Sequence, residues 1–212
     1  MSNTSIVSQT VTHAKATVIF AHGAGADKNS DFLNLVSAQL LPHGINVLRF
    51  NFPYMDKRLQ DGKRRPPDRM PKLIECLAQV IEEHKTSLPL YLMGKSMGGR
   101  VAATLAKDHS EHIRGVICLG YPFHPHKQPD KLRLEPLQNI TKPVLIIQGD
   151  RDALGNKCEI ERYEISTRCQ LHFLPDGDHD LKPRVKSGHT HQQHLHSAIT
   201  IINGFINENN EN

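Results

Sequence analysis

The first candidate for chemistry in this chain is a serine at position 96, with glycines two residues before and two residues after it. An apolar run at 88–93 precedes this segment, and a helical pattern at 101–106 follows it. This order predicts a strand, a sharp turn and a helix, with Ser96 at the apex of the turn. Glycines at 94 and 98 suit such a turn, because larger side chains would collide with the neighbouring strand or helix. Ser96 is therefore the candidate nucleophile.

A serine hydroxyl is a weak nucleophile unless a base takes its proton. The chain has 14 histidines, so the choice of a base needs a positional reason. His179 alone stands in a loop directly beyond the predicted strand at 171–174. His172 lies within that strand, and the histidines at 189–196 fall at the start of the last predicted helix. We therefore expect His179 to be the base.

An acid is needed to hold the imidazole in the correct tautomer. Asp150 and Asp152 both follow the predicted strand at 144–147 and compete for this role. Asp152 is favoured because it lies far enough beyond the strand to fold back toward the histidine loop, whereas Asp150 suits a cap or turn. Asp178 and Asp180 flank His179 and are typical turn formers. The order along the chain is then serine, acid, histidine.

The negative charge that develops on a carbonyl oxygen under attack needs two backbone donors. The N–H of Met97, at the start of a predicted helix, is one candidate, because the helix dipole also favours negative charge there. The N–H of Ala24 is the other, because the small residues at 22–26 let the backbone approach a substrate. Five further residues near the same strand ends are candidates for substrate contact: His22, Gly25, Lys95, Tyr121 and His124.

The elements that must position these residues alternate along the chain. The apolar, β-branched runs stand at 16–21, 46–50, 88–93, 115–119, 144–147 and 171–174, and the amphipathic segments at 31–41, 71–84 and 191–207. Such alternation predicts an α/β fold with a doubly wound, mostly parallel sheet flanked by helices. Four strand ends with residues of catalytic type would then meet at one edge of the sheet.

The predicted organisation is one domain spanning 1–212, with a frayed polar tail at 207–212. Two long Pro-rich connections, 51–70 and 121–139, show no clear helical pattern over most of their length. Both follow the carboxyl ends of strands, where ligands bind in open α/β sheets, so we expect them to form walls of the site. The chain leaves no room for a large cap domain.

Composition narrows the class of protein further. No apolar run approaches the roughly 20 residues of a membrane helix, and the N-terminus does not read as a secretory signal, so we expect a cytoplasmic protein without a membrane partner. The four cysteines are widely spaced, which argues against a disulfide framework or a zinc site. No carboxylate or cysteine completes a metal site with His124, His126 or the histidines at 189–196, so neither metal nor cofactor is expected.

The net charge of +4 is concentrated in the stretch 57–69, which is rich in lysine and arginine. This stretch is either a solvated loop or a region that attracts an anionic substrate or partner. Nucleic acid is not an expected partner, because the stretch has no interleaved aromatic residues and no nucleic-acid-binding module is present. The expected partner is a small ester-type molecule. If the basic stretch has a functional role, this molecule is anionic.

Six segments together resemble the α/β-hydrolase superfamily: residues 22–26, 51–54, 94–100, 120–125, 149–152 and 177–179. Within it, the chain is similar to the small, lid-less, dienelactone-hydrolase-like proteins. More narrowly, it looks like a family of predicted hydrolases that includes testis-expressed protein 30 and a subunit of a chromatin acetyltransferase complex. The resemblance implies Ser96, Asp152 and His179 as the triad, although dienelactone hydrolases proper use a cysteine nucleophile.

The resulting hypothesis is a serine hydrolase that cleaves a carboxylic ester or thioester through an acyl-enzyme. Two alternatives stay open. One is a non-catalytic interaction module that keeps the hydrolase fold. The other is an acyltransferase or peptidase that uses the same residues, because one fold hosts many activities.

Overall fold

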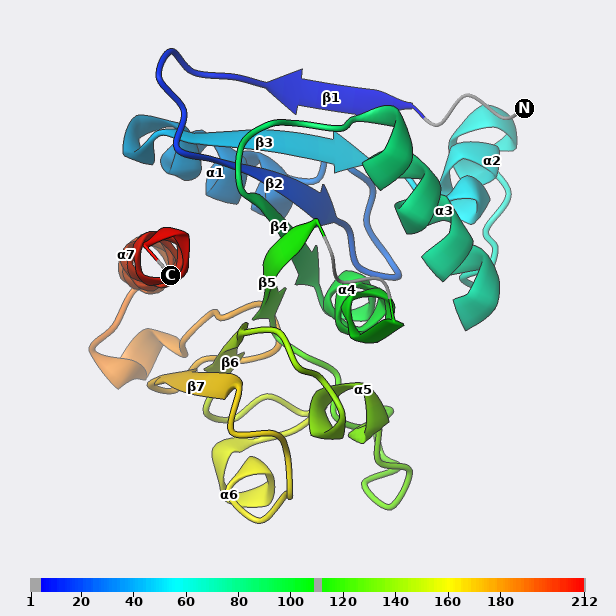
Figure 1. Ribbon diagram of the computed structural model, residues 1–212. Coiled ribbons are helices and arrows are strands. Elements are labelled where there is room, and N and C mark those ends of the chain that lie inside the picture. Colours follow the sequence, from blue (N-terminus) through cyan, green and yellow to red (C-terminus); the bar gives the residue numbers. More distant parts are fainter. Residues whose placement is uncertain (1–4, 109–111, 212) are drawn as a thin grey trace.

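A computed structural model describes residues 5–108 and 112–211 of the chain (Figure 1). Within them, one seven-stranded sheet has the order β1-β3-β2-β4-β5-β6-β7. The strands are β1 Ile6–Gln9, β2 Ala16–Ala21, β3 Ile45–Phe50, β4 Leu90–Lys95, β5 Ile113–Leu119, β6 Val144–Gly149 and β7 Cys169–Leu174. All neighbouring strands are parallel except β1 and β3, which are antiparallel. The predicted α/β fold with a mostly parallel sheet is confirmed.

Helices cover both faces of this sheet (Figure 1). They are α1 Asp31–Leu40, α2 Pro53–Asp61, α3 Met70–Glu83, α4 Met97–Asp108, α5 Glu135–Gln138, α6 Lys157–Ile160 and α7 His191–Asn210, with short 3-10 turns at Leu41–His43 and Val185–Ser187. Helices α1 and α7 pack on one face, and α2 to α6 pack on the other. No large cap covers the sheet edge within the described residues.

The central strands are apolar along their whole length because both of their faces are buried. In β4, Leu90 and Leu92 point into the apolar cluster beneath α3 and α4. Tyr91 and Met93 point into the cluster beneath α1 and α7. Strand β4 lies between β2 and β5, so the turn that follows it is held from both sides.

Strand β1 and helices α2, α5 and α6 were not predicted. Strand β1 pairs with β3 from Ile6 opposite Phe50 to Gln9 opposite Val47. Three of its four residues are half-exposed and Ser8 is exposed, so it forms no apolar run. Helix α2 occupies Pro53–Asp61, a part of the connection 51–70 in which the sequence shows no clear helical pattern. The sequence of α2 shows no helical periodicity of apolar residues, because most of its residues are charged or polar and it buries only two adjacent side chains, Tyr54 and Met55.

The polar end of the chain is helical, so the expectation of a frayed tail from residue 207 is wrong for 207–210. The hydroxyl of Tyr91 donates to the side-chain oxygen of Asn210 over 2.8 Å. The Asn210 amide in turn donates to the backbone oxygen of Lys15, and the Lys15 ammonium donates to the side chain of Asn207. These polar side chains extend the helix because they hydrogen-bond to the rest of the fold. No helix among the described residues has both the length and the apolar composition to cross a membrane.

We predict that Tyr91→Phe lowers the free energy of unfolding by about 1–2 kcal/mol, because it removes a buried donor that serves both Asn210 and the Ile206 carbonyl. Urea denaturation measures this change. Tyr163→Phe is the matched control, because the Tyr163 hydroxyl has no hydrogen bond to the described residues. An equal loss in both variants would show that the hydroxyl of Tyr91 does not hold the end of α7.

Candidate active site

The carboxyl ends of β4, β6 and β7 bring three predicted residues together. Ser96 follows β4 directly, Asp152 lies in the turn after β6, and His179 lies in the loop after β7. The Nε2 atom of His179 lies 2.8 Å from Ser96 Oγ, and its Nδ1 atom lies 2.8 Å from Asp152 Oδ2. The three side chains thus form one continuous hydrogen-bonded chain.

The turn that presents Ser96 is tightly packed. Ser96 has φ +52°, in the left-handed region that non-glycine residues rarely adopt. A Cβ atom on Gly94 would lie 2.1 Å from the backbone carbon of Gly98. A Cβ atom on Gly98 would lie 2.5 Å from the backbone oxygen of Ala21 in β2. The backbone of this turn therefore has no room for larger residues at either position, as the sequence predicts.

Asp152 is fully buried and accepts three hydrogen bonds. Besides His179, its donors are the Gln148 amide, at 2.8 Å, and the backbone N–H of Leu154, at 2.8 Å. Because a carboxylate is an acceptor only, this contact places a proton on Nδ1 of His179 and leaves Nε2 to accept from the Ser96 hydroxyl. The geometry matches a base that is ready to take a proton.

Two of the competing aspartates serve other purposes. The backbone of Asp150 donates to the Leu174 carbonyl and belongs to the turn after β6. The Asp178 carboxylate accepts from the backbone N–H groups of Asp180 and Lys182, as expected of a turn former. Of Asp150 and Asp152, it is Asp152 that contacts the imidazole.

Gln148 is a site residue that the sequence analysis missed. Its amide donates to Asp152 and to the backbone oxygens of Tyr121 and Gly155. It thereby joins the acid to the loops that follow β5 and β6. Its position at the end of an otherwise apolar strand could have identified Gln148 as a site residue from the sequence.

Lys95 lies behind the nucleophile and not in the cavity, which corrects the expectation that it contacts substrate. Its side chain is 8% exposed, and its ammonium donates to the His179 carbonyl over 2.7 Å. The ammonium also lies 3.1 Å from Asp180 Oδ1 and over the ring of Phe32. Burial lowers the pKa of Lys95, and Asp180 opposes this shift. Lys95 therefore supports the loop that carries His179.

Three more predicted substrate contacts are buried in the loops around the site and do not line the cavity beside Ser96. His22 accepts from the backbone N–H of Phe52, and its other ring nitrogen lies 2.7 Å from the Gly23 oxygen. The Tyr121 hydroxyl donates to the Arg133 backbone oxygen over 2.9 Å. His124 contacts its own loop and lies 3.5 Å from a Glu159 oxygen. Sequence position alone does not reveal on which side of a strand end such a side chain lies.

A cavity of about 460 Å³ opens beside Ser96. Ala24 and Met97, the two predicted sources of backbone donors, both line it. Its walls come from the two long connections, with Pro67 and Asp68 from the first and Pro122, Pro125, His126 and Arg133 from the second. The prediction that these connections wall the site is confirmed, and His126 takes the place expected for His124.

A second cavity of about 540 Å³ shares Ala24 and Pro67 with the first. Gly25 lines it, together with three arginines from the basic stretch: Arg58, Arg64 and Arg65. The Arg65 guanidinium is paired with the Asp61 carboxylate. The basic stretch therefore lies next to the candidate site and not on a remote surface.

A serine at a strand-to-helix turn of a mostly parallel sheet, with a histidine and an aspartate from later strand ends, is the arrangement of the α/β-hydrolase fold. Residues 14–207 match the family described as alpha/beta hydrolase domain, and the chain belongs to this family. The narrower resemblance to the family of testis-expressed protein 30 stays a prediction.

Three solved structures illustrate this similarity of fold. A dienelactone hydrolase from Anabaena variabilis is 20% identical with a TM-score of 0.72, covering 96% of this chain and 90% of that one. Est1E from Butyrivibrio proteoclasticus, solved with ferulic acid bound, is 18% identical with a TM-score of 0.68, covering 99% and 96%. A lid-less α/β serine hydrolase from Xanthomonas campestris is 17% identical with a TM-score of 0.65, covering 96% and 86%.

We predict that Lys95→Met loosens the loop at 178–182 without a large loss of global stability. The variant removes the donor to the His179 carbonyl but also removes the cost of burying a charge, so the two effects offset to within about 1 kcal/mol. Amide hydrogen exchange should become faster in this loop and stay unchanged in β4 and β5. Unchanged exchange in the loop would show that Lys95 does not hold it.

We also predict that His22 makes stability pH-dependent. Burial lowers the pKa of His22 from 6.5 to about 4, so the folded protein keeps this ring neutral while the unfolded chain protonates it. The contribution of the neutral His22 ring to the free energy of unfolding is complete above pH 6.5. It is lost as the pH falls toward 4, by up to about 3 kcal/mol.

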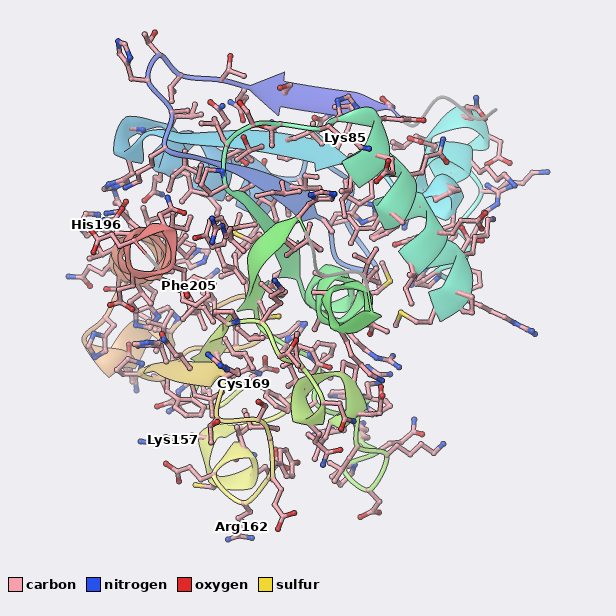
Figure 2. All side chains as sticks on the ribbon, in the orientation of Figure 1. Lys85, Lys157, Arg162, Cys169, His196 and Phe205 are labelled. Carbon is pink, nitrogen blue, oxygen red and sulfur yellow. The ribbon has the colours of Figure 1, made fainter. Side chains whose placement is uncertain are left out.

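Urea denaturation between pH 7.5 and 4 tests this prediction. The variant His22→Asn should show a shallower dependence of unfolding free energy on pH than wild type. His196→Asn is the matched control, because His196 is exposed on the outer side of α7 (Figure 2) and should keep the wild-type slope. Equal slopes for wild type and His22→Asn would contradict the prediction.

Proposed function

We propose that this protein is a serine hydrolase that cleaves a carboxylic ester or thioester through an acyl-enzyme intermediate. The observation that carries the proposal is the position of the His179 imidazole, 2.8 Å from both Ser96 Oγ and Asp152 Oδ2. A nucleophile, a base and an orienting acid within hydrogen-bonding distance are the parts that this chemistry needs.

The proposed reaction begins when Ser96 Oγ attacks the carbonyl carbon and His179 Nε2 takes the hydroxyl proton. Asp152 stabilises the imidazolium that forms. The tetrahedral intermediate then collapses, and His179 gives the proton to the departing alcohol or thiol. A water molecule, activated by the same imidazole, hydrolyses the acyl-enzyme and restores Ser96.

The oxyanion of the tetrahedral intermediate needs hydrogen-bond donors beside Ser96. Met97 begins α4, whose first N–H groups have no acceptor within the helix and lie at the positive end of its dipole. Ala24 lines the same cavity from the loop after β2. Their backbone N–H groups are our proposed oxyanion hole.

Two further observations support hydrolysis over a non-catalytic role. The three side chains are complete and hydrogen-bonded, and an interaction module would not require them. One structural relative is a serine hydrolase without a lid, and another is solved with ferulic acid, a small carboxylic compound, bound to it; both support the proposal.

We predict that a fluorophosphonate probe labels the wild-type protein and does not label Ser96→Ala. On a 4-nitrophenyl ester, His179→Ala should lose at least about 10³-fold in kcat, and Asp152→Asn about 10⁴-fold, because the amide would favour the wrong imidazole tautomer. Asp150→Asn is the matched control, because its side chain does not contact the imidazole, and it should keep the wild-type rate. Circular dichroism checks that each variant is folded.

Folded wild-type protein that resists the probe would overturn the proposal and favour the interaction module. Labelling that persists in Ser96→Ala would place the nucleophile elsewhere.

A further inference from the structure

Two arginines, Arg100 and Arg133, line the cavity beside Ser96. Arg100 lies in the first turn of α4, and Arg133 lies in the connection between β5 and α5. Neither guanidinium forms an ion pair within the described residues. The Nε atom of Arg100 is buried and has no hydrogen-bond partner there. Buried polar groups of this kind normally have a partner, so Arg100, which lines the cavity, has an unused donor.

The cavity has one acidic side chain, and that group is already engaged. One carboxylate oxygen of Asp68 accepts from the Lys72 ammonium over 2.8 Å. The other accepts from the backbone N–H of Tyr54 over 3.0 Å. Asp68 therefore does not neutralise the two arginines, and the cavity keeps an excess of positive charge.

The two guanidinium groups also repel each other. Burial lowers the pKa of Arg133, and the charge of Arg100 lowers it further. Two like charges that line one cavity are unfavourable unless an anion lies between them.

Both arginines are anchored relative to the nucleophile. The backbone N–H of Arg100 donates to the Ser96 carbonyl over 3.1 Å. Arg100 therefore lies one helical turn beyond the nucleophile. The backbone of Arg133 is held at both ends, since its N–H donates to the Phe123 carbonyl over 2.7 Å and its carbonyl accepts from the Tyr121 hydroxyl. The positive charge is thus built into the wall of the cavity.

Resting on the proposed function, we infer that the cavity beside Ser96 binds an anionic group of the substrate, a carboxylate or a phosphate, between Arg100 and Arg133. Planar guanidinium groups bind both anions through paired N–H donors. The substrate class is then an ester or thioester with an anionic group near the scissile bond, such as a half-ester of a dicarboxylic acid.

The test compares kcat/KM for the neutral ester 4-nitrophenyl valerate with that for the monoanionic ester 4-nitrophenyl hydrogen glutarate. Wild type should prefer the anionic ester by about tenfold or more. Arg133→Gln and Arg100→Gln should each reduce this preference severalfold, mainly through KM, and the double variant should abolish it. A second pair of esters, with the carboxylate on the leaving group instead, shows which side of the scissile bond the arginines face.

Two matched arginine variants serve as controls. Arg162 is exposed at the outer edge of the molecule beyond α6 (Figure 2), so Arg162→Gln should keep the wild-type preference. Arg64 lines the neighbouring cavity, so Arg64→Gln tests whether the basic stretch supplies the charge instead. A preference that depends on Arg64 and not on Arg100 or Arg133 would overturn the inference.

A binding measurement on Ser96→Ala separates this inference from the proposed function. Glutarate and inorganic phosphate, tested separately at matched ionic strength, should raise its thermal unfolding midpoint, and the ion that raises it more identifies the anion. The rise should disappear when Arg100→Gln and Arg133→Gln are added. If wild type reacts with the fluorophosphonate but shows no preference for the anionic ester, and neither anion stabilises Ser96→Ala, the anion site alone is overturned. Absence of labelling would overturn the proposed function, and the binding measurement would then decide the anion site by itself.

Discussion

The candidate site depends on how closely the backbones of neighbouring strand ends approach one another. The turn after β4 touches β2, and the turn after β6 touches the loop of His179 in the same way, since a Cβ atom on Gly149 would lie 2.2 Å from the Gly177 oxygen. On Gly120, after β5, a Cβ atom would lie 2.7 Å from the oxygen of His179. Backbone contact at these points fixes the separation of Ser96, Asp152 and His179.

Buried polar groups on the two sides of Ser96 differ in whether they have partners within the protein. Behind it, Lys95 and Asp152 are each hydrogen-bonded to protein atoms: Lys95 holds the loop of His179, and Asp152 orients the imidazole. In front of it, Arg100 and Arg133 face the cavity without an acidic partner among the described residues. Paired buried charge is typical of structural support, whereas unpaired charge in a cavity is typical of a site that awaits a ligand.

Sequence reasoning predicted the sheet and the three central residues because parallel strands bring their carboxyl ends to one edge. Spacing and order along the chain then suffice to choose His179 among many histidines. They do not reveal on which side of a strand end a side chain points, which is why Lys95 and His22 were assigned to the cavity. Helix α2 was missed for a related reason, since its buried face is too small to leave a periodic pattern.

The walls of the cavity suggest how such a site would select a substrate. Pro67, Pro122 and Pro125 line it, and proline fixes the backbone torsion φ, so these walls have little freedom to reshape around a ligand. No large cap covers the sheet edge among the described residues. The fixed groups that line the cavity include Arg100 and Arg133, and charge complementarity between them and an anionic group would distinguish one substrate from another.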